Sequence, residues 1–130
     1  MFISKATAPM PSFPAKTHSH DSNNLWPYVT VKDALSRVND EDSLPNMKGK
    51  TTGLKPGQHG IIRLAPYGIA PTLRASSATP FHYSEDRCIN VREAANLEGF
   101  PLEYNFHGCV LSQYQQAGNA VPVELSTAVA

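Results

Sequence analysis

Two stretches of the chain carry apolar residues at helical spacing, and both begin with a capping signal. The first stretch has four apolar residues at positions i, i+3, i+4 and i+7 of one helical face: Val31, Ala34, Leu35 and Val38. Thr30 precedes this face and Asp33 stands three residues later, which is the order of a capping box. The pattern predicts a two-turn helix over residues 31–38 that packs against a core.

The second stretch predicts a short helix with a sharp stop. Its apolar residues form a narrow stripe: Val91, Ala94, Ala95 and Leu97. Asn90 is a favourable N-cap, and Glu93 can reach back to the Asn90 amide to complete a capping box. Gly99 can adopt the left-handed conformation that ends a helix, and Pro101 prevents its continuation.

The residues between these two helices follow other patterns. Residues 39–58 are rich in proline, glycine and polar side chains, which predicts a mobile loop. The apolar run 60–65 predicts a strand. Residues 69–74 predict a second extended segment, which Pro71 places at a sheet edge or beside a bulge.

The last part of the chain predicts a turn followed by a helix. Gly118 and Asn119 indicate a tight turn in which the glycine takes a positive φ. Pro122 suits the first turn of a helix. Residues 123–130 carry the apolar side chains of that helix.

Length and composition allow one small, loop-rich domain. The 130 residues are 41% apolar, slightly under the usual ~45–50%, and include 11 prolines. No apolar run approaches the ~20 residues that a membrane span needs, so no membrane segment is predicted. Two cysteines without a secretory signal indicate a reducing compartment. We expect Cys88 and Cys109 to act as small apolar residues, buried or half-buried.

The formal net charge is +0, but the charges are segregated. Residues 43–84 contain no aspartate or glutamate. The same span carries five lysines and arginines: Lys48, Lys50, Lys55, Arg63 and Arg74. A basic span inside a neutral chain suits a polyanionic partner. A solvated loop explains the charge alone equally well.

His18, His20 and Asp21 have a spacing that metal ligands can use. No second cluster of ligands completes a site. A polar turn is by far the commoner origin of so short a match, so we predict no metal site.

Three segments together resemble one protein family. Residues 87–101, Arg-Cys-Ile-Asn-Val-Arg-Glu-Ala-Ala-Asn-Leu-Glu-Gly-Phe-Pro, resemble conserved motif nine of the cytosine carbon-5 DNA methyltransferases. About a dozen residues later, residues 113–122 resemble motif ten, whose hallmark is Gln-x-Gly-Asn-(Ala/Ser)-Val. Residues 68–74 resemble the Gly-x-Ala-x-Thr segment of the family's target recognition domain. Motifs nine and ten stand in the family's order and at its spacing.

The resemblance implies an α+β fragment of a larger fold. Residues 1–18 would be the end of a catalytic-domain strand and a connector, and residues 19–86 a target recognition region of short strands and loops. Residues 87–130 would supply the C-terminal helices of a Rossmann-like methyltransferase catalytic domain. By this comparison Met1 falls inside a strand, and the chain is the C-terminal part of a longer enzyme.

The resemblance also implies a cofactor edge. In the family, the Asn-Ala-Val turn of motif ten borders the S-adenosylmethionine pocket. Asn119, Ala120 and Val121 are therefore the candidate cofactor-binding residues. Taken alone, Asn119 is equally well a turn asparagine that satisfies its own backbone.

The candidate DNA-binding residues are Thr72, Arg74 and Arg92. The family's threonine at the Thr72 position contacts the backbone beside the flipped nucleotide. Arg74 could hold a phosphate or read guanine in the major groove. Arg92 matches an arginine that holds the recognition domain against the catalytic domain, a structural task that supports DNA binding. On spacing alone, Thr72 would be an ordinary strand residue.

The catalytic parts of the family are not in this sequence. Neither the Pro-Cys-Gln motif of the nucleophile nor the Glu-Asn-Val motif is present, so we assign no catalytic residue. Asn96, Glu98 and the pair Leu102-Glu103 also depart from the family's usual arginine, glutamine and aspartate pair. We therefore predict no turnover by this chain alone. Its expected partners are double-stranded DNA and the N-terminal catalytic part of the same enzyme.

Three alternatives stay open. The chain could be a DNA-binding or interaction module without catalysis, which salt-dependent DNA binding would favour. It could be a truncation that does not fold, because the last helix would lack its partner surface. A transfer-RNA methyltransferase of the same superfamily is a weaker alternative, since that branch has a reduced recognition domain. The expected location is the nucleus, or the nucleoid in a bacterium.

Overall fold

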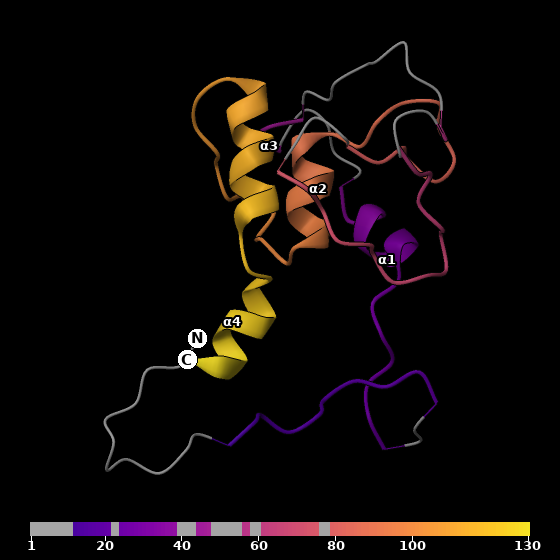
Figure 1. Cartoon of the computed structure of the whole chain (residues 1–130), viewed down its shortest axis with the longest axis vertical. Coiled ribbons are helices and arrows are strands. Elements are labelled where there is room, and N and C mark those ends of the chain that lie inside the picture. The colour runs from indigo at the N-terminus through magenta and orange to yellow at the C-terminus, as the bar shows by residue number, and fades with distance from the viewer. Residues whose placement is uncertain (1–11, 22–23, 39–43, 48–55, 58–60, 76–78) are drawn as a thin grey trace.

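The computed structural model describes residues 12–21, 24–38, 44–47, 56–57, 61–75 and 79–130. Within these ranges the chain forms four helices: α1 (Val31–Leu35), α2 (Val91–Leu97), α3 (Val110–Asn119) and α4 (Val123–Val129). Figure 1 shows α2 between α1 and α3, with α4 continuing below α3. None of the four helices combines the length and the hydrophobicity that a membrane crossing requires.

Helix α1 forms as its cap predicts. Thr30 Oγ1 accepts a hydrogen bond from the Asp33 amide at 3.2 Å, and the Asp33 carboxylate accepts one from the Thr30 amide at 3.2 Å. The helix is shorter than expected, because it ends at Leu35 and passes into a turn. Val38 is nevertheless buried, so all four residues of the predicted apolar face belong to the core.

Helix α2 confirms the predicted capping box but not the narrow stripe. Asn90 Oδ1 accepts from the Glu93 amide and Glu93 Oε2 from the Asn90 amide, both at 2.7 Å. Gly99 has a φ of 78° and ends the helix as predicted. Every residue from Val91 to Asn96 is buried, because α1 and α3 both pack against α2 and its polar side chains contact loops. The helix is therefore the centre of the fold rather than an amphipathic surface helix.

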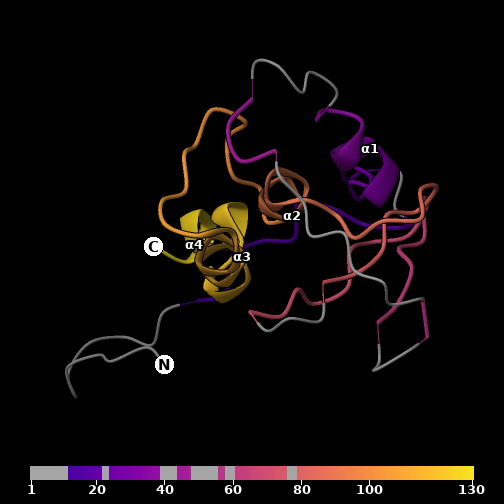
Figure 2. The ribbon, with the colours of Figure 1, turned by 90° about the horizontal axis from the view of Figure 1, so that it is seen from above.

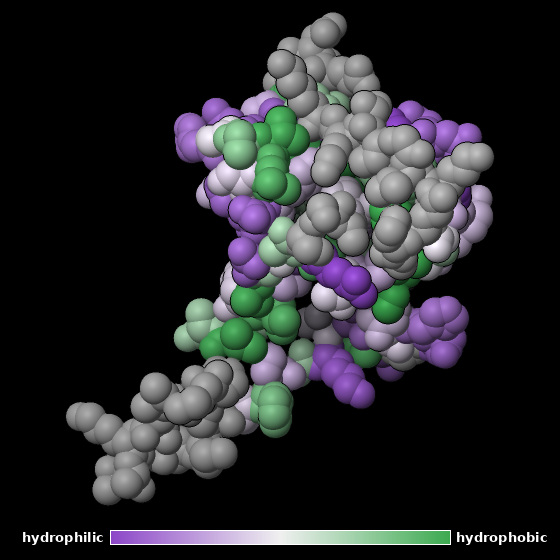
Figure 3. All heavy atoms as spheres, turned by 45° about the horizontal axis from the view of Figure 1, so that its top comes forward, coloured by the Kyte–Doolittle hydropathy of each residue, from purple (hydrophilic) through white to green (hydrophobic). Residues whose placement is uncertain are grey.

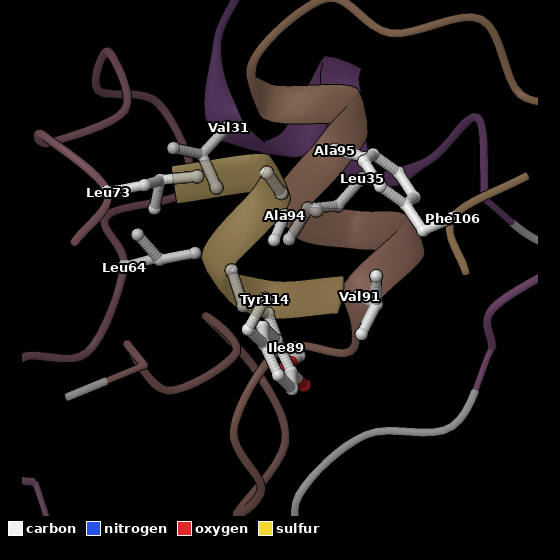
Figure 4. Packing of buried hydrophobic residues seen from close by; sticks show 11 residues of the cluster. Val31, Leu35, Leu64, Leu73, Ile89, Val91, Ala94, Ala95, Phe106 and Tyr114 are labelled. Carbon is white, nitrogen blue, oxygen red and sulfur yellow. The ribbon is translucent and has the colours of Figure 1, made fainter. Parts of the chain in front are cut away.

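One hydrophobic cluster joins α1, α2 and α3 to the extended segment at residues 64–73. Its buried members are Val31, Leu35, Leu64, Leu73, Ile89, Val91, Ala94, Ala95, Phe106, Tyr114 and Ala117. Figure 4 shows their side chains converging from α1, α2, α3 and residues 64–73. Because apolar burial is the main stabilising term, this cluster sets how residues 64–73 pack against α1, α2 and α3.

The predicted strand at residues 60–65 is reduced to a single bridge over the described residues. Arg63 pairs with Phe81 in parallel, and Phe81 pairs with Cys88 in antiparallel fashion. The pairing stops there because Pro66 and Pro80 flank it and have no amide donor. Over the described residues the fragment is therefore mainly helical, with isolated bridges where the α+β expectation had short strands.

Helix α4 is attached at its start and exposed along its length. The Val123 amide donates to the Glu98 carbonyl at 3.0 Å, which fastens α4 to the end of α2. None of the α4 residues is buried. Val121, Leu125 and Val129 expose 57%, 52% and 39% of their surface, and Figure 3 shows hydrophobic residues around this helix. Seen from above, α3 and α4 lie nearly in line (Figure 2).

His82 is buried beside a group of ion pairs. Its Nδ1 accepts from the Ser84 amide at 3.3 Å and lies 3.5 Å from Glu85, and its Nε2 lies 3.9 Å from Glu93. Arg87 binds Glu93 through two hydrogen bonds of 2.8 Å. Burial lowers the pKa of His82 from its ordinary value of 6.5, although Glu93 opposes this shift. Burial in the fold therefore favours the neutral form of the ring.

The pKa of His82 predicts a loss of stability in acid. Because the folded-state pKa is below the unfolded value of 6.5, the unfolded chain binds the proton more tightly. The contribution of His82 is complete above that value and is lost as the pH falls below it. We expect the midpoint of thermal unfolding to decrease between about pH 7.5 and about pH 5.5, and to decrease less in His82→Gln. The exposed-site variant His107→Gln should keep the wild-type pH dependence. An identical pH dependence in wild type and His82→Gln would contradict the prediction.

Candidate functional site

The candidate DNA segment presents alternate residues to solvent. Thr72 and Arg74 are exposed, whereas Leu73 between them is buried in the core cluster. This alternation is that of an extended chain lying on a hydrophobic surface. Both polar side chains are therefore accessible to a partner, and their DNA contacts stay a prediction.

The candidate cofactor edge lies at the end of α3. Asn119 and Val121 are exposed and Ala120 is half-buried. Helix α3 runs through Gly118 and Asn119, so the predicted tight turn with a positive φ at Gly118 is wrong. The chain leaves the helix at Ala120, whose φ is −69°.

Gly118 joins these two candidate segments. A Cβ atom at Gly118 would lie 2.7 Å from the Ala75 nitrogen and 2.8 Å from the Arg74 carbonyl carbon. Both are backbone atoms, which cannot swing away as a flexible side chain could. The glycine of motif ten is thus needed for close approach rather than for a turn. Through this contact the end of α3 lies directly against the segment that carries Thr72 and Arg74.

A hydrogen bond fixes the other half of α3. The Tyr114 hydroxyl donates to the Ile89 carbonyl at 2.6 Å, just before α2 begins. Tyr114 and Ala117 are the buried residues of α3 and belong to the core cluster. The position of α3 is therefore set by α2 on one side and by residues 74–75 on the other.

Arg92 is fully buried, with an exposed fraction of 0%. Its Nε donates to the Pro45 carbonyl at 3.1 Å and its Nη1 to the Pro101 carbonyl at 2.9 Å, and Nη2 contacts the Tyr104 carbonyl. The Asn46 side chain accepts a further hydrogen bond at 3.3 Å. Burial lowers the pKa of the guanidinium. Arginine nevertheless stays protonated in proteins. Arg92 can therefore act toward DNA only by holding other segments in place.

The basic span is only partly available as a surface. Arg63 is directed into the fold, where it donates to the His82 carbonyl at 2.9 Å and contacts the Asp86 carboxylate. The three lysines of the span lie outside the described residues. Arg74 is exposed. The structure thus leaves Arg74 as the accessible cation among the described residues of this span.

The cysteine expectation is confirmed at one position and wrong at the other. Cys88 is buried in a small cluster with Ile61 and Phe81. Cys109 is exposed, because it is the N-cap of α3 and precedes the first buried residue of that helix.

The histidine-rich turn shows local polar contacts. His20 Nδ1 lies 2.6 Å from Asp21 Oδ1, and both side chains are exposed. His18 pairs with Trp26 through a parallel bridge. Across the described ranges, no three histidine, cysteine or acidic residues are grouped closely enough to hold a metal ion.

Asn96 and Glu98, which depart from the motif-nine pattern, both have defined surroundings in the structure. Asn96 is buried and its Nδ2 contacts the Ala34 carbonyl, which ties α2 to α1. Glu98 lines a small pocket of about 110 Å³ between α1, α2 and α4, and burial raises its pKa. These residues fit the local structure, so the departures do not disrupt the motif-nine helix.

The contacts of Asn46 were not predicted from the sequence. The loop that contains it was expected to be mobile, yet Asn46 contacts Arg92, Phe106 and Gln113. Its φ of 63° places it in the left-handed region, where asparagine is enriched among residues other than glycine. A Pro-Asn pair in a loop carries the local turn signal, but not the distant contacts.

Comparison with known proteins gives a matching family model and several relatives. The family model described as C-5 cytosine-specific DNA methylase matches residues 6–130. DNA (cytosine-5)-methyltransferase 3 of Arabidopsis thaliana is 47% identical over 112 residues, which is 86% of this chain. A type II methyltransferase of Xanthomonas oryzae is 40% identical over 76 residues, or 52% of the chain. A type II methyltransferase of Haemophilus parahaemolyticus is 48% identical over 50 residues, or 38% of the chain.

The chain spans a small part of these relatives. The matched segment covers 7% of the Arabidopsis protein, 18% of the Xanthomonas protein and 13% of the Haemophilus protein. The similarity therefore concerns one segment of each protein.

The close contact at Gly118 predicts the effect of adding one methyl group. In an unobstructed helix, replacing glycine by alanine stabilises by about 1 kcal/mol. Here the methyl group would meet backbone atoms, so we expect Gly118→Ala to lower the free energy of unfolding by about 1–3 kcal/mol. Gly68→Ala is the matched control, because its Cβ would meet the Ala65 Cβ at 3.4 Å, and we expect a change within about 0.5 kcal/mol. Denaturant unfolding checks both values. A stabilised Gly118→Ala variant would contradict the contact.

Proposed function

Because this chain belongs to the C-5 cytosine-specific DNA methylase family, we propose that it is the recognition and C-terminal segment of a DNA (cytosine-5)-methyltransferase. The proposed activity of the whole enzyme is transfer of a methyl group from S-adenosylmethionine to carbon 5 of cytosine in DNA. The observation that carries the proposal is the contact between Gly118 and the backbone of residues 74–75. That contact brings the candidate DNA segment and the candidate cofactor edge together.

The chemistry of the cofactor edge suits S-adenosylmethionine. Asn119 offers an amide donor and acceptor, and Val121 offers an exposed apolar surface beside it. Such a pairing can hold a ligand that has both polar and aromatic parts. When bound, the cofactor supplies the methyl group. The role of Asn119, Ala120 and Val121 is to orient it at the edge of α3.

The exposed pair Thr72 and Arg74 is proposed to hold DNA. A base that undergoes chemistry must leave the stack, and the opened backbone then needs polar contacts to hold it. The Thr72 hydroxyl can donate to a phosphate oxygen, and the Arg74 guanidinium can bind phosphate or guanine. Arg92 contributes indirectly, by fixing the loop and the segments beside α2.

The exposed apolar side of α4 is proposed to pack on the remaining catalytic domain. Leu125 lines a groove together with Trp26 and Tyr28. Both Trp26 and Leu125 expose more than half of their surface. Exposed apolar side chains grouped in this way are typical of a packing interface. The proposed division is the end of a catalytic-domain strand and a connector at residues 1–18, a recognition region at 19–86 and a returning catalytic segment at 87–130.

Two consequences belong to this proposal. The sequence contains no Pro-Cys-Gln or Glu-Asn-Val motif, so we propose that the isolated chain does not turn over. Because its proposed substrate is DNA, we also propose that the enzyme acts in the nucleus, or in the nucleoid of a bacterium. A non-catalytic DNA-binding role is the second candidate, because the exposed Thr72 and Arg74 could hold DNA without the two catalytic motifs.

The proposal predicts activity only after the catalytic part is restored. We expect no methyl transfer to duplex DNA by the chain alone, measured with radiolabelled S-adenosylmethionine. A chimera of the Arabidopsis relative in which this chain replaces the matched segment should transfer methyl groups to cytosine. Arg74→Ala should weaken DNA binding and reduce the magnitude of the negative slope of log affinity against log salt by about 1.

Arg37→Ala is the matched control, because Arg37 is exposed outside residues 72–74. It should leave the salt slope unchanged. A folded chimera that binds DNA without methyl transfer would support the non-catalytic candidate. Equal effects of Arg74→Ala and Arg37→Ala would refute the proposed DNA surface.

A further inference from the structure

Asn46 holds three distant segments from one position in the loop at residues 44–47. It stands 46 residues before Arg92, 60 before Phe106 and 67 before Gln113. Its Oδ1 accepts from the Phe106 amide at 2.9 Å and from Arg92 Nη2 at 3.3 Å. Its Nδ2 donates to the Phe106 carbonyl and to Gln113 Oε1, both at 3.1 Å. One short side chain thus connects α2, α3 and the segment between them.

The contacts require a primary amide at this position. The Asn46 side chain pairs with both the amide and the carbonyl of Phe106, as a neighbouring backbone peptide would. An aspartate has acceptors only, so it could not donate to the Phe106 carbonyl or to Gln113. A reversed amide would set donor against donor at Phe106 and at Arg92. The hydrogen-bond network therefore fixes both the residue type and its orientation.

The backbone conformation at residue 46 also favours asparagine. Its φ of 63° is a conformation that asparagine tolerates better than most residues with a side chain. The Arg92 amide also donates to the Asn46 carbonyl at 3.2 Å, which holds the loop against the first turn of α2. Backbone conformation and side-chain chemistry thus both favour asparagine.

We propose that Asn46 is a positioning residue for α3. Phe106 belongs to the segment that leads into α3, and Gln113 lies in its first half. By holding both while it binds Arg92 of α2, Asn46 sets the place of α3 relative to α2. The end of α3 carries Asn119, Ala120 and Val121. What this edge binds rests on the proposed function, whereas the positioning itself does not.

The test compares the same charge change at two asparagines. Asn46→Asp removes both donated hydrogen bonds and places a carboxylate against Gln113 Oε1. We expect the midpoint of thermal unfolding to fall by about 5 °C or more, given the usual effect of losing about one net hydrogen bond. Asn105→Asp introduces the same charge at an exposed neighbour of Phe106. It should shift the midpoint by less than about 1 °C.

A second readout separates positioning from general stability. In backbone amide NMR of the full chain, Asn46→Asp should shift the resonances of Gly118 and Ala120 at the far end of α3, whereas Asn105→Asp should leave them in place. A double-mutant cycle with Gln113→Leu should be non-additive, because that substitution already removes the acceptor facing Nδ2 of Asn46.

If Asn46→Asp does not fold, Gln113→Glu and Gln113→Leu give the comparison from α3. Both lose the hydrogen bond to the Gly108 carbonyl, but only the glutamate keeps an acceptor for Asn46. The glutamate variant should then move the Gly118 and Ala120 resonances less.

Equal shifts for the paired variants, or an additive cycle, would overturn the proposal. If the resonances respond as expected but the chimera does not methylate DNA, the proposed function fails and the positioning role stands.

Discussion

The structure depends on one buried cation. Arg92 is enclosed within the chain, and burial of an ionised group is costly unless every donor finds a partner. Its donors meet carbonyls from the loop before it and the segment after α2, together with the Asn46 side chain. None of these partners is a carboxylate. The guanidinium is therefore held by oriented dipoles, and removing one segment would leave donors unpaired.

The need to pair the donors of the buried Arg92 explains how the four described helices take up a defined arrangement. The described helices have 5, 7, 10 and 7 residues, which is too short for stability by themselves. Hydrogen bonds from the Arg92 side chain to these loops add long-range contacts of the kind that a β-sheet supplies in other folds. The core cluster then brings Leu64 and Leu73 against α1, α2 and α3. Hydrophobic packing and a satisfied buried charge together keep the candidate DNA and cofactor segments adjacent.

Local signals made part of this fold predictable from the sequence. The capping boxes at Thr30 and Asn90 each involve residues three positions apart, so their residue types are sufficient evidence. Gly99 likewise ends α2 by its own backbone conformation. Motifs nine and ten identified the family, which helical spacing alone could not have done.

The remaining features depend on contacts between distant residues. Gly118 was expected in a turn because glycine often serves there, whereas its actual role is to admit the backbone of residues 74–75. Asn46 looked like part of a polar loop, and nothing within a few residues of it reveals Phe106 or Gln113. Residues 60–65 were predicted to form a strand, but the flanking prolines have no amide N–H to donate to a partner strand. Such contacts appear only once the fold is known.

The most direct measurement of this account is the free energy of unfolding of Arg92→Lys beside Arg37→Lys. Lysine keeps the positive charge but lacks the planar fork that reaches several carbonyls at once. If Arg92 organises the fold, the Arg92→Lys variant should lose at least about 2 kcal/mol, and the exposed Arg37→Lys variant less than about 0.5 kcal/mol. Similar small losses in both variants would contradict the account, because the segments around α2 would then be held by hydrophobic packing alone.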